Sequence, residues 1–282
     1  MRGVSIDVMR VRKRFAARHG EAEALRDVSL SLKAGEFCAL VGPSGCGKTT
    51  LLNLIAGLDK PDGGEIRVGG QRVTGPGPDR TVIFQDAALF PWLTVRANVE
   101  YGLKVKRLPR SERADRVEAV LRAVQLSRWA DALVHELSGG MKQRIALARS
   151  MVLQPAVLLM DEPFTALDLR TRELLEREVE IAWLKERPSV VFVSHHLKAA
   201  VLLADRIFAF GSRPGRILRE LRVNLPRPRR AESPAVEALA RELKATLGSE
   251  VDRNSAFEMG EGPTPTALTR RSWTDDHPDI DR

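Results

Sequence analysis

Three short stretches of the chain are almost wholly apolar, and polar residues follow each of them at once. They are Phe37 to Val41, Val157 to Met160 and Val190 to Val193. Unbroken apolar runs of this length are typical of strands that a parallel sheet buries on both faces. The carboxyl ends of parallel strands form the ligand crevice of α/β proteins. We therefore expect the polar residues after the three runs to share one crevice.

The remaining hydrophobic patterns fill in an α/β domain over residues 1–232. Alternation at Val28 to Leu32 and the glycine-bounded segment Gly63 to Gly70 predict an antiparallel β-layer near the start of the chain. Between residues 86 and 152 the apolar residues recur at helical spacing, which predicts a nested helical subdomain. The clearest apolar stripe is Val117, Val120, Leu121 and Val124. The last core strands are expected at Ile207 to Phe210 and Ile217 to Leu221.

The end of the chain has a different character. Ser233 and Pro234 are suited to begin an amphipathic helix over residues 233–248, and Gly248 is suited to end it. Glycine, proline and mixed charges from 249 to 282 predict a disordered tail. The basic cluster of Arg227, Arg229 and Arg230 is interpreted as a disordered linker, with contact to anionic lipid head groups as the alternative.

The residues after the first apolar run match the spacing G-x-x-x-x-G-K-[ST] of a phosphate-binding loop. Glycines let successive backbone N–H groups point at phosphate oxygens, and a helix N-terminus favours the negative charge. The Lys48 side chain is expected to reach the outer phosphates, and the Thr49 hydroxyl is suited to Mg²⁺. A glycine-rich surface turn is the alternative interpretation. The expected contacts to a bound nucleotide are Gly42, Pro43, Ser44, Gly45, Cys46, Gly47, Lys48, Thr49 and Thr50.

The second apolar run ends in two acids, Asp161 and Glu162. A carboxylate at the end of a neighbouring strand can hold Mg²⁺, and a second one can orient and deprotonate an attacking water. We assign these roles to Asp161 and Glu162 in that order. Pro163 follows directly, so an acidic cap for the next helix is the alternative.

The third run ends in Ser194, His195 and His196. A histidine at the carboxyl end of a parallel strand is well placed to contact a terminal phosphate. It could equally be a structural residue with satisfied hydrogen bonds. The other motifs favour the phosphate role for His195.

A second anion site is predicted at Leu137 to Met141. Ser138 is a good N-cap, and the residues from Lys142 to Arg149 are rich in helix formers. The free N–H groups and the dipole of such a helix attract an anion. An ordinary capped surface helix is the alternative. Two phosphate-type sites in one chain indicate either two bound phosphates or one nucleotide shared between two copies of the chain.

Taken together, these motifs resemble the nucleotide-binding subunit of an ATP-binding cassette (ABC) transporter, and the resemblance covers about residues 4–247. The phosphate loop, Gln85, the Leu137 to Met141 signature, the acid pair, Asp168 and His195 occur in the order and at the intervals of that family. The resemblance implies a P-loop NTPase core of the ABC ATPase type with an antiparallel β-layer and a nested α-helical subdomain. It implies MgATP as the bound nucleotide and ATP hydrolysis as the activity.

The resemblance also implies roles for individual residues and partners. Gln85 would sense the γ-phosphate and contribute to the Mg²⁺ site with Thr49 and Asp161. Ser138, Gly139, Gly140 and Asp168 would close over ATP held by a second copy of the chain. Phe15 falls where the family places an aromatic that stacks on adenine, although it could simply pack on the first β-layer. The expected catalytic residues are Glu162, His195, Gln85 and Lys48.

Three segments resemble the nitrate, sulfonate and taurine branch of importers. They are Gly75 to Arg80, Leu89 to Trp92 and Ser212 to Ile217. The branch implies permease subunits that dock near Gln85 to Trp92, an extracytoplasmic solute-binding protein as an indirect partner, and the cytoplasmic face of the inner membrane as the location. Bicarbonate or a vitamin precursor remain open as solutes, as does export. His196 departs from the family's usual Asp, which we expect to alter contacts across the dimer rather than the chemistry.

Composition agrees with a peripheral subunit. The chain has 282 residues, two cysteines and a formal net charge of +8. No apolar run reaches the length of a membrane span, and the cysteines give no disulfide framework. Basic residues are mixed with acids at helical spacing, so we expect solvated faces and no nucleic-acid partner. A GTPase would need a guanine-reading motif that is absent, and soluble cassette ATPases usually pair two cassettes in one chain.

Overall fold

A six-stranded sheet forms the centre of the protein in the computed structural model, which describes residues 3–17, 20–165, 167–211 and 213–258. The strands lie in the order β10-β9-β3-β8-β7-β6. All neighbours pair in parallel except β10 and β9. The bounds are β3 Phe37–Val41, β6 Arg80–Ile83, β7 Val157–Asp161, β8 Ser189–Val193, β9 Arg206–Gly211 and β10 Arg216–Arg222. Every residue of β3, β7 and β8 is buried, as their apolar runs predict.

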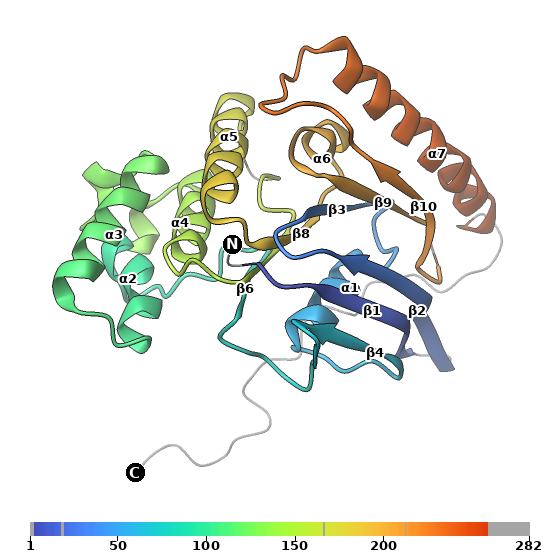
Figure 1. Cartoon of the computed structure of the whole chain (residues 1–282), viewed down its shortest axis with the longest axis horizontal. Helices are drawn as coiled ribbons and strands as arrows, with labels where there is room; N and C mark the ends of the chain where they lie inside the picture. The colour runs from blue at the N-terminus through green and yellow to red at the C-terminus, as the bar shows by residue number, and fades with distance from the viewer. Residues whose placement is uncertain (1–2, 18–19, 166, 212, 259–282) are drawn as a thin grey trace.

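A second, antiparallel sheet has the order β2-β1-β4-β5. Its strands are β1 Ile6–Ala17, β2 Gly20–Leu32, β4 Gly63–Val68 and β5 Gln71–Arg72. Alternation along β2 puts Val28, Leu30 and Leu32 on the buried side, because side chains of a strand point to opposite faces in turn. A register shift before Val28 lets Leu25 be buried as well. The sequence predicted this β-layer, and it appears at the lower right of Figure 1.

The central sheet separates two hydrophobic clusters. Cys38 and Leu40 of β3 face helix α1 (Lys48–Ala56) and the antiparallel sheet. The alternate residues Phe37, Ala39 and Val41 face a cluster to which α4 (Gly139–Met151), α5 (Leu169–Glu186), α6 and α7 contribute. The bounds of the last two of these helices are α6 Leu197–Leu203 and α7 Pro234–Glu258. The helix after the phosphate loop and the helix after the signature therefore cover opposite faces of one sheet.

The predicted helical segment packs at one edge of the sheet, at the left of Figure 1. It contains α2 Val95–Val105, α3 Arg110–Ala123, two short 3₁₀ helices (η1 Ser127–Trp129 and η2 Val134–Glu136) and α4 Gly139–Met151. The predicted stripe of Val117, Val120, Leu121 and Val124 is buried. The Thr94 hydroxyl caps α2 by accepting a hydrogen bond from the Ala97 N–H at 3.2 Å.

The C-terminal helix does not end where the sequence pattern predicted. Helix α7 passes through Gly248 and continues to Glu258. Gly248 has no positive φ angle, so it does not adopt the left-handed conformation of a helix cap. One interior glycine costs a helix only about 1 kcal/mol relative to alanine, which continued hydrogen bonding offsets. The structure thus has residues 249–258 in helix α7, where the sequence pattern predicted disorder, and residues 259–282 lie outside the described part of the chain.

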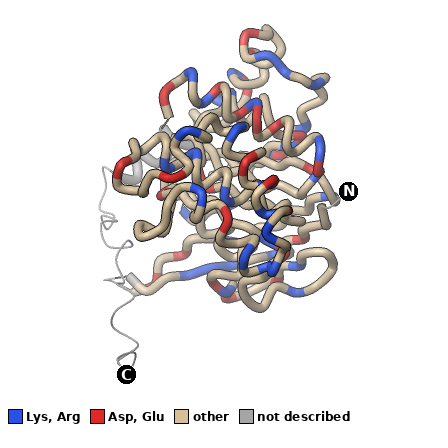
Figure 2. Tube along the Cα trace, turned by 90° about the vertical axis from the view of Figure 1, so that its left-hand side faces the viewer, with Lys and Arg blue, Asp and Glu red and all other residues tan. Residues whose placement is uncertain are grey.

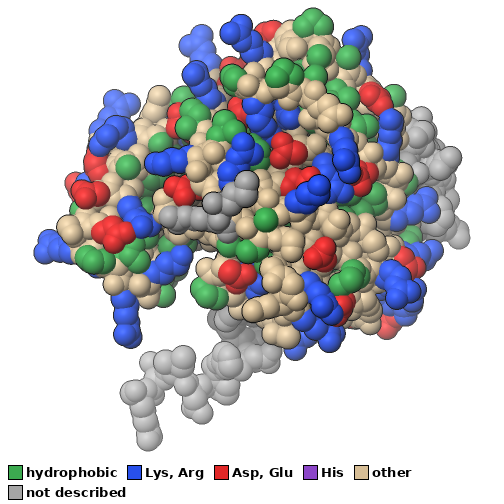
Figure 3. Space-filling view, in the orientation of Figure 1, with side chains coloured by type: hydrophobic (Ala, Val, Ile, Leu, Met, Phe, Trp, Pro, Cys, Tyr) green, Lys and Arg blue, Asp and Glu red, His purple; other side chains and the backbone are tan. Residues whose placement is uncertain are grey.

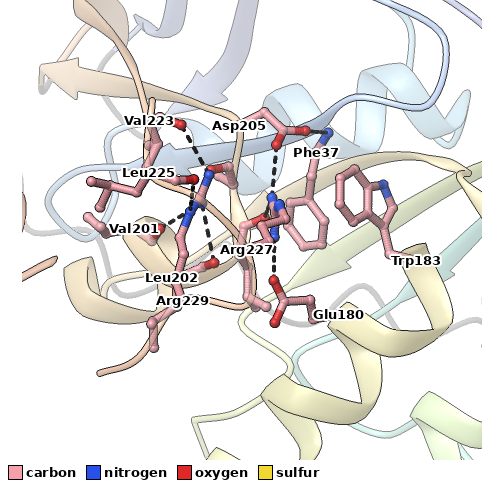
Figure 4. Close-up of polar contacts among 12 residues, drawn as sticks. Phe37, Glu180, Trp183, Val201, Leu202, Asp205, Val223, Leu225, Arg227 and Arg229 are labelled. Atoms are coloured by element: carbon pink, nitrogen blue, oxygen red, sulfur yellow. Dashed lines mark hydrogen bonds and ion pairs between the residues drawn. The ribbon is translucent and has the colours of Figure 1, made fainter. Parts of the chain in front are cut away.

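The basic segment after β10 is ordered, contrary to the linker interpretation (Figure 4). Arg227 pairs with Glu180 at 2.7 Å and with Asp205 at 2.9 Å, and its guanidinium lies 4.4 Å from the centre of the Trp183 ring. These partners belong to β9's entry loop and to α5 (Leu169–Glu186). Arg227 therefore ties the segment to two elements of the core.

Arg229 makes a different set of contacts in the same segment (Figure 4). Its guanidinium donates hydrogen bonds to five backbone carbonyls, those of Val201, Leu202, Ala204, Val223 and Leu225. The first three lie at the C-terminus of α6, whose last carbonyls have no partner within the helix. Burial lowers the pKa of Arg229 to about 10, helped by the nearby charge of Arg227. No sequence pattern pointed to these acceptors, because they come together only in the folded chain.

The surface carries its charges in a mixed pattern. Figure 2 shows basic and acidic positions interspersed along the trace, and Figure 3 shows the same mixture on one face. Several pairs stand one turn apart on a helix, such as Glu112 with Arg116 and Glu100 with Lys104. Among the described residues, no helix is both long and apolar enough to cross a bilayer.

Candidate functional site

Four loops with predicted site residues leave the same edge of the central sheet. The phosphate loop follows β3, His195 follows β8, Glu162 follows β7 and Gln85 lies two residues beyond β6. These strands are consecutive neighbours and all parallel, so their carboxyl ends coincide. The structure thus brings together residues that are up to about 150 positions apart, as the three apolar runs predicted.

The phosphate loop turns directly into α1. Gly47, the N-cap, has a φ angle of 90°, and a Cβ placed there would lie 2.7 Å from a methyl carbon of Leu25. Only glycine meets both conditions without strain. The backbone N–H groups of Lys48, Thr49 and Thr50 in the first turn have no carbonyl partner within the helix. They are available to an anion in front of the loop.

Lys48 is buried and folds back onto its own loop. Its ammonium donates to the carbonyls of Gly42 and Pro43 at 2.8 Å and 2.7 Å. The sulfur of Cys46 lies 3.4 Å from the same nitrogen. Burial raises the pKa of the Cys46 thiol. The lysine is therefore positioned at the loop, with contacts that phosphate oxygens can replace.

Thr49 and Asp161 meet across the gap between α1 and β7. The threonine hydroxyl donates to a carboxylate oxygen of Asp161 at 3.1 Å. Burial raises the pKa of Asp161, while the hydroxyl of Thr49 and the charge of Lys48 act in the opposite direction. A buried carboxylate beside a hydroxyl is an oxygen donor set that fits Mg²⁺, which takes few protein ligands in nucleotide sites. A bound cation would also offset the cost of burying the carboxylate.

Glu162 and His195 form a hydrogen-bonded pair. A carboxylate oxygen of Glu162 lies 2.9 Å from Nδ1 of His195, and the same oxygen accepts from the Thr165 hydroxyl at 3.1 Å. Glu162 has a φ angle of 47°, which is uncommon for a residue with a side chain. Its N–H donates to the carbonyl of Val193 at 3.0 Å, so β8 holds this turn in place.

His196 lies next to this pair. Its ring packs against that of His195 with centroids 4.1 Å apart. Burial lowers the pKa of His196, and the charges of Arg172 and His195 lower it further. The neutral ring therefore adds no positive charge beside His195 near neutral pH.

Gln85 is exposed, and nearby contacts connect its segment to α4. The preceding carbonyl, of Phe84, accepts a hydrogen bond from the buried Gln143 side chain at 3.4 Å. Arg149 of the same helix donates to the carbonyls of Ala87 and Ala88. The sequence patterns did not single out Gln143 for this contact with the Gln85 segment. Its position just beyond the signature was the one feature that could have indicated it.

An aromatic group follows the Gln85 segment. Phe90 contacts the rings of Trp92 and Tyr101, with centroids 5.7 Å and 4.7 Å apart. Trp92 is 73% exposed, and the guanidinium of Arg149 lies 5.6 Å from the centre of the Phe90 ring. A large exposed aromatic held by its neighbours is a typical anchor for a partner protein.

The signature begins helix α4 as predicted. The Ser138 hydroxyl caps the helix by accepting from the Met141 N–H at 3.3 Å, and Gly139 and Gly140 form the first turn. Asp168 caps α5 by accepting from the Thr171 N–H at 3.0 Å. Helix α4, which Ser138 caps, packs on the face of the sheet opposite to α1.

Phe15 borders a surface cavity of about 460 Å³. The residues that line it come from β1, β2 and the start of β4, and none belongs to the phosphate loop. The ammonium of Lys13 lies 5.1 Å from the centre of the Phe15 ring. Stacking on adenine therefore stays a prediction for Phe15.

Arg213 is a neighbour of the phosphate loop that the sequence did not reveal as such. A Cβ built on Gly45 would lie 3.4 Å from a guanidinium nitrogen of Arg213. The turn holding it is fixed by Gly215, whose N–H donates to the Ala24 carbonyl at 2.9 Å. The Arg213-Pro214-Gly215 segment marked a branch of importers in the sequence, and its contact with the loop arises only in three dimensions.

Comparison with known sequences gives a consistent set of relatives. The profile of the ABC transporter family matches residues 25–165. The nitrate import ATP-binding protein NrtD of Synechocystis sp. is 47% identical over 78% of this chain and 83% of its own length. The taurine import ATP-binding protein TauB of Roseobacter denitrificans is 44% identical over 79% of this chain and 83% of its own length.

Solved structures give the same answer for the fold. A dimeric ATP-binding cassette in a post-hydrolysis state, bound to ADP and phosphate, aligns with a TM-score of 0.71. It is 31% identical and covers 78% of this chain and all of its own. The predicted arrangement of a phosphate-loop core, an antiparallel layer and a helical segment is thus one that solved proteins share.

Proposed function

Because the chain belongs to the ABC transporter family and is one of its ATPases, we propose that it drives uptake of a small anion through partner membrane subunits. The observation that carries this proposal is the Glu162–His195 pair, 2.9 Å apart at the sheet edge that also carries the phosphate loop. A carboxylate fixed by a histidine next to a phosphate site is suited to activate water.

MgATP is the substrate in this proposal. The N–H groups of the phosphate loop and the Lys48 ammonium hold the β- and γ-phosphates, once Lys48 exchanges its two loop carbonyls for phosphate oxygens. Thr49, Asp161 and Gln85 would hold Mg²⁺, which would neutralise charge at the phosphates when bound. The 3.1 Å contact between Thr49 and Asp161 supports this assignment, because it places the two oxygens side by side.

Water activation falls to Glu162 in the proposal. Its carboxylate accepts the proton of the attacking water, and His195 fixes the orientation of the carboxylate and approaches the terminal phosphate. The hydroxyl of Thr165 adds a second fixed contact at 3.1 Å. With two donors on one oxygen, the other carboxylate oxygen is left for water.

A second copy of the chain completes the site. Ser138, Gly139 and Gly140 offer the free N–H groups of the α4 N-terminus, and Asp168 lies at the start of α5. The position of α4 across the sheet from α1 supports a nucleotide shared between two chains over one confined to a single chain. Phe15 would contact the adenine in this arrangement.

The transport partner is proposed from the exposed surface and from the relatives. Permease subunits dock near Gln85 to Trp92, where the aromatic group offers an anchor. The chain then works at the cytoplasmic face of the membrane, and a solute-binding protein acts on it only through the permease. Nitrate and taurine are the solutes in the relatives' names. Bicarbonate or a vitamin precursor would need the same residues in this chain.

The shared-nucleotide proposal is tested with the Glu162→Gln variant. We expect it to bind MgATP, to lose at least about a hundredfold in turnover, and to shift from monomer to dimer with MgATP. Light scattering coupled to size-exclusion chromatography measures the shift. A Lys48→Ala chain serves as the control that should stay monomeric. Turnover of Glu162→Gln at the parent rate would show that another group activates the water.

The transport proposal is tested by coexpression with the neighbouring permease genes in cells that lack their own anion uptake. We expect radiolabelled nitrate or taurine to accumulate with the parent chain and not with Glu162→Gln. Trp92→Ala should reduce uptake while leaving the ATPase activity of the isolated chain within about twofold, since Trp92 is remote from the phosphates. Efflux instead of accumulation would contradict the import direction.

A further inference from the structure

A second basic site lies in the helical segment, apart from the nucleotide site. It is a surface cavity of about 410 Å³ between the end of α3, the 3₁₀ helix η1 and α4. Its walls are formed by Arg122, Gln125, Ser127, Arg128, Trp129 and Arg144. Three of the six lining residues are arginines, and no acid lines the cavity among the residues that the structure describes. The wall therefore has an excess of positive charge.

The three arginines differ in how their charge is compensated. Arg122 is 73% exposed and lies 3.8 Å from Glu118. Arg128 has no ion pair with any described residue. Burial opposes the charge of Arg144 most, Asp168 favours it, and Arg128 opposes it to a smaller extent.

Two lining side chains also have a polar atom that lacks a partner. The Ser127 hydroxyl and the Nε of Arg144 are buried and form no hydrogen bond within the described chain. Arg144 uses another nitrogen to donate to the Val124 carbonyl at 3.2 Å. A buried polar atom without a partner has lost its hydrogen bonds to water and gained none in return. Both atoms belong to residues that line the cavity.

We propose that this cavity binds a small oxyanion, such as sulfate, phosphate or nitrate. Guanidinium groups match the paired oxygens of an oxyanion, and each such contact is stronger than a neutral hydrogen bond. The anion would stand between Arg128 and Arg144 and form an attractive contact with each. Arg144 and Ser138 belong to the same helix, so the bound charge would act on the helix that carries the signature.

Trp129 provides a reporter for the test, because it lines the cavity and is 37% exposed. The full-length chain, saturated with MgADP so that nucleotide fills the phosphate loop, is titrated with sodium sulfate against sodium chloride of equal ionic strength. We expect a saturable change in tryptophan fluorescence with sulfate only. Phosphate and nitrate titrations then tell whether the cavity selects a tetrahedral or a planar anion. Trp129→Phe should remove the optical change, while calorimetry still detects binding.

Matched charge variants decide whether the cavity is the site. Arg128→Gln should weaken sulfate binding about tenfold or more, since it removes a guanidinium contact. Arg110→Gln removes one exposed positive charge at the other end of α3 and should leave binding within about twofold. Equal weakening in both variants, or a response to chloride that matches the response to sulfate, would reduce the effect to general screening and overturn the proposal.

Discussion

Two acidic side chains, Asp161 and Glu176, are buried in different surroundings. Burial raises the pKa of Asp161, but the Thr49 hydroxyl and the Lys48 ammonium partly offset it. Glu176 lies on the inner side of α5, where burial raises its pKa from 4.5 to about 7 and Arg172 alone offsets it. The first acid belongs to the nucleotide site. The second is a cost to the fold near neutral pH.

Glu176→Gln should therefore change how stability depends on pH. Because folding raises the pKa of Glu176, the folded state holds the proton more tightly than the unfolded chain. This contribution to stability is complete below pH 4.5 and is lost as the pH rises through about 7. At pH 8 the variant should be more stable than the parent by up to roughly 3 kcal/mol, with little difference at pH 4.5.

Urea unfolding of the parent and the Glu176→Gln variant at several pH values measures this difference. Glu178 offers the matched control, because it lies on the same helix and shows no such burial. Glu178→Gln should leave the pH profile of the parent unchanged. A constant offset between Glu176→Gln and the parent at every pH would mean that packing, and not the proton, accounts for the change.

At single positions, the sequence predicted what local spacing determines. The glycines and Lys48 of the phosphate loop, the acids after β7 and the Ser138 cap are local patterns, and the structure places them in the expected elements. The burial of Glu176 and the closeness of Arg213 to Gly45 depend on which elements pack together. A pattern within one segment cannot contain that information.

At the scale of elements, the segment between β10 and α7 is held by two arginines with different partners. Arg227 forms ion pairs with Glu180 and Asp205. Arg229 donates hydrogen bonds to carbonyls at the end of α6 that have no partner within the helix. The composition of this segment is that of a linker, which explains the wrong prediction from sequence. The segment is ordered by hydrogen-bond acceptors that lie more than twenty positions away along the chain.

Arg229→Ala should destabilise the protein by roughly 2–4 kcal/mol, because buried carbonyls at the end of α6 lose their donor. Arg230→Ala removes an exposed arginine one position further on and should change stability by less than about 0.5 kcal/mol. Thermal and urea unfolding of the two variants give the comparison. Similar effects from both would indicate that the contacts of Arg229 contribute nothing specific.

At the scale of the whole molecule, the central sheet organises the site. The sequence predicted both the parallel core and the antiparallel layer. Continuous apolar runs indicate strands buried on both faces, whereas alternation indicates strands buried on one face. The place of β3 between β8 and β9 has no local signal, yet it sets which loops become neighbours. The same sheet puts α1 and α4 on opposite faces, at the right and left of Figure 1.

That separation has a genetic consequence. If each nucleotide is held by the phosphate loop of one chain and the signature of another, two defective alleles can rescue one another. Lys48→Ala disables the phosphate loop, and Gly139→Asp disables the signature. Apart from the chain neighbours of Gly139 and the backbone of its own helix, no described atom lies within 4 Å of a Cβ built there, so we expect the second change to leave the fold intact. Each allele alone should give no ATPase activity.

Mixed together, the two variant chains should regain part of the ATPase activity. In a heterodimer, the intact phosphate loop of the Gly139→Asp chain meets the intact signature of the Lys48→Ala chain. Coexpression of the two alleles under separate affinity tags, followed by an ATPase assay of the doubly purified pairs, measures the rescue. A double-mutant chain paired with the parent should give no activity, because each of the two shared sites in that pair combines one sound motif with one defective motif. Activity in that pair would show that the two motifs act within one chain. A cell would then have this ATPase activity only if it carries both alleles, and neither gene product alone would provide it.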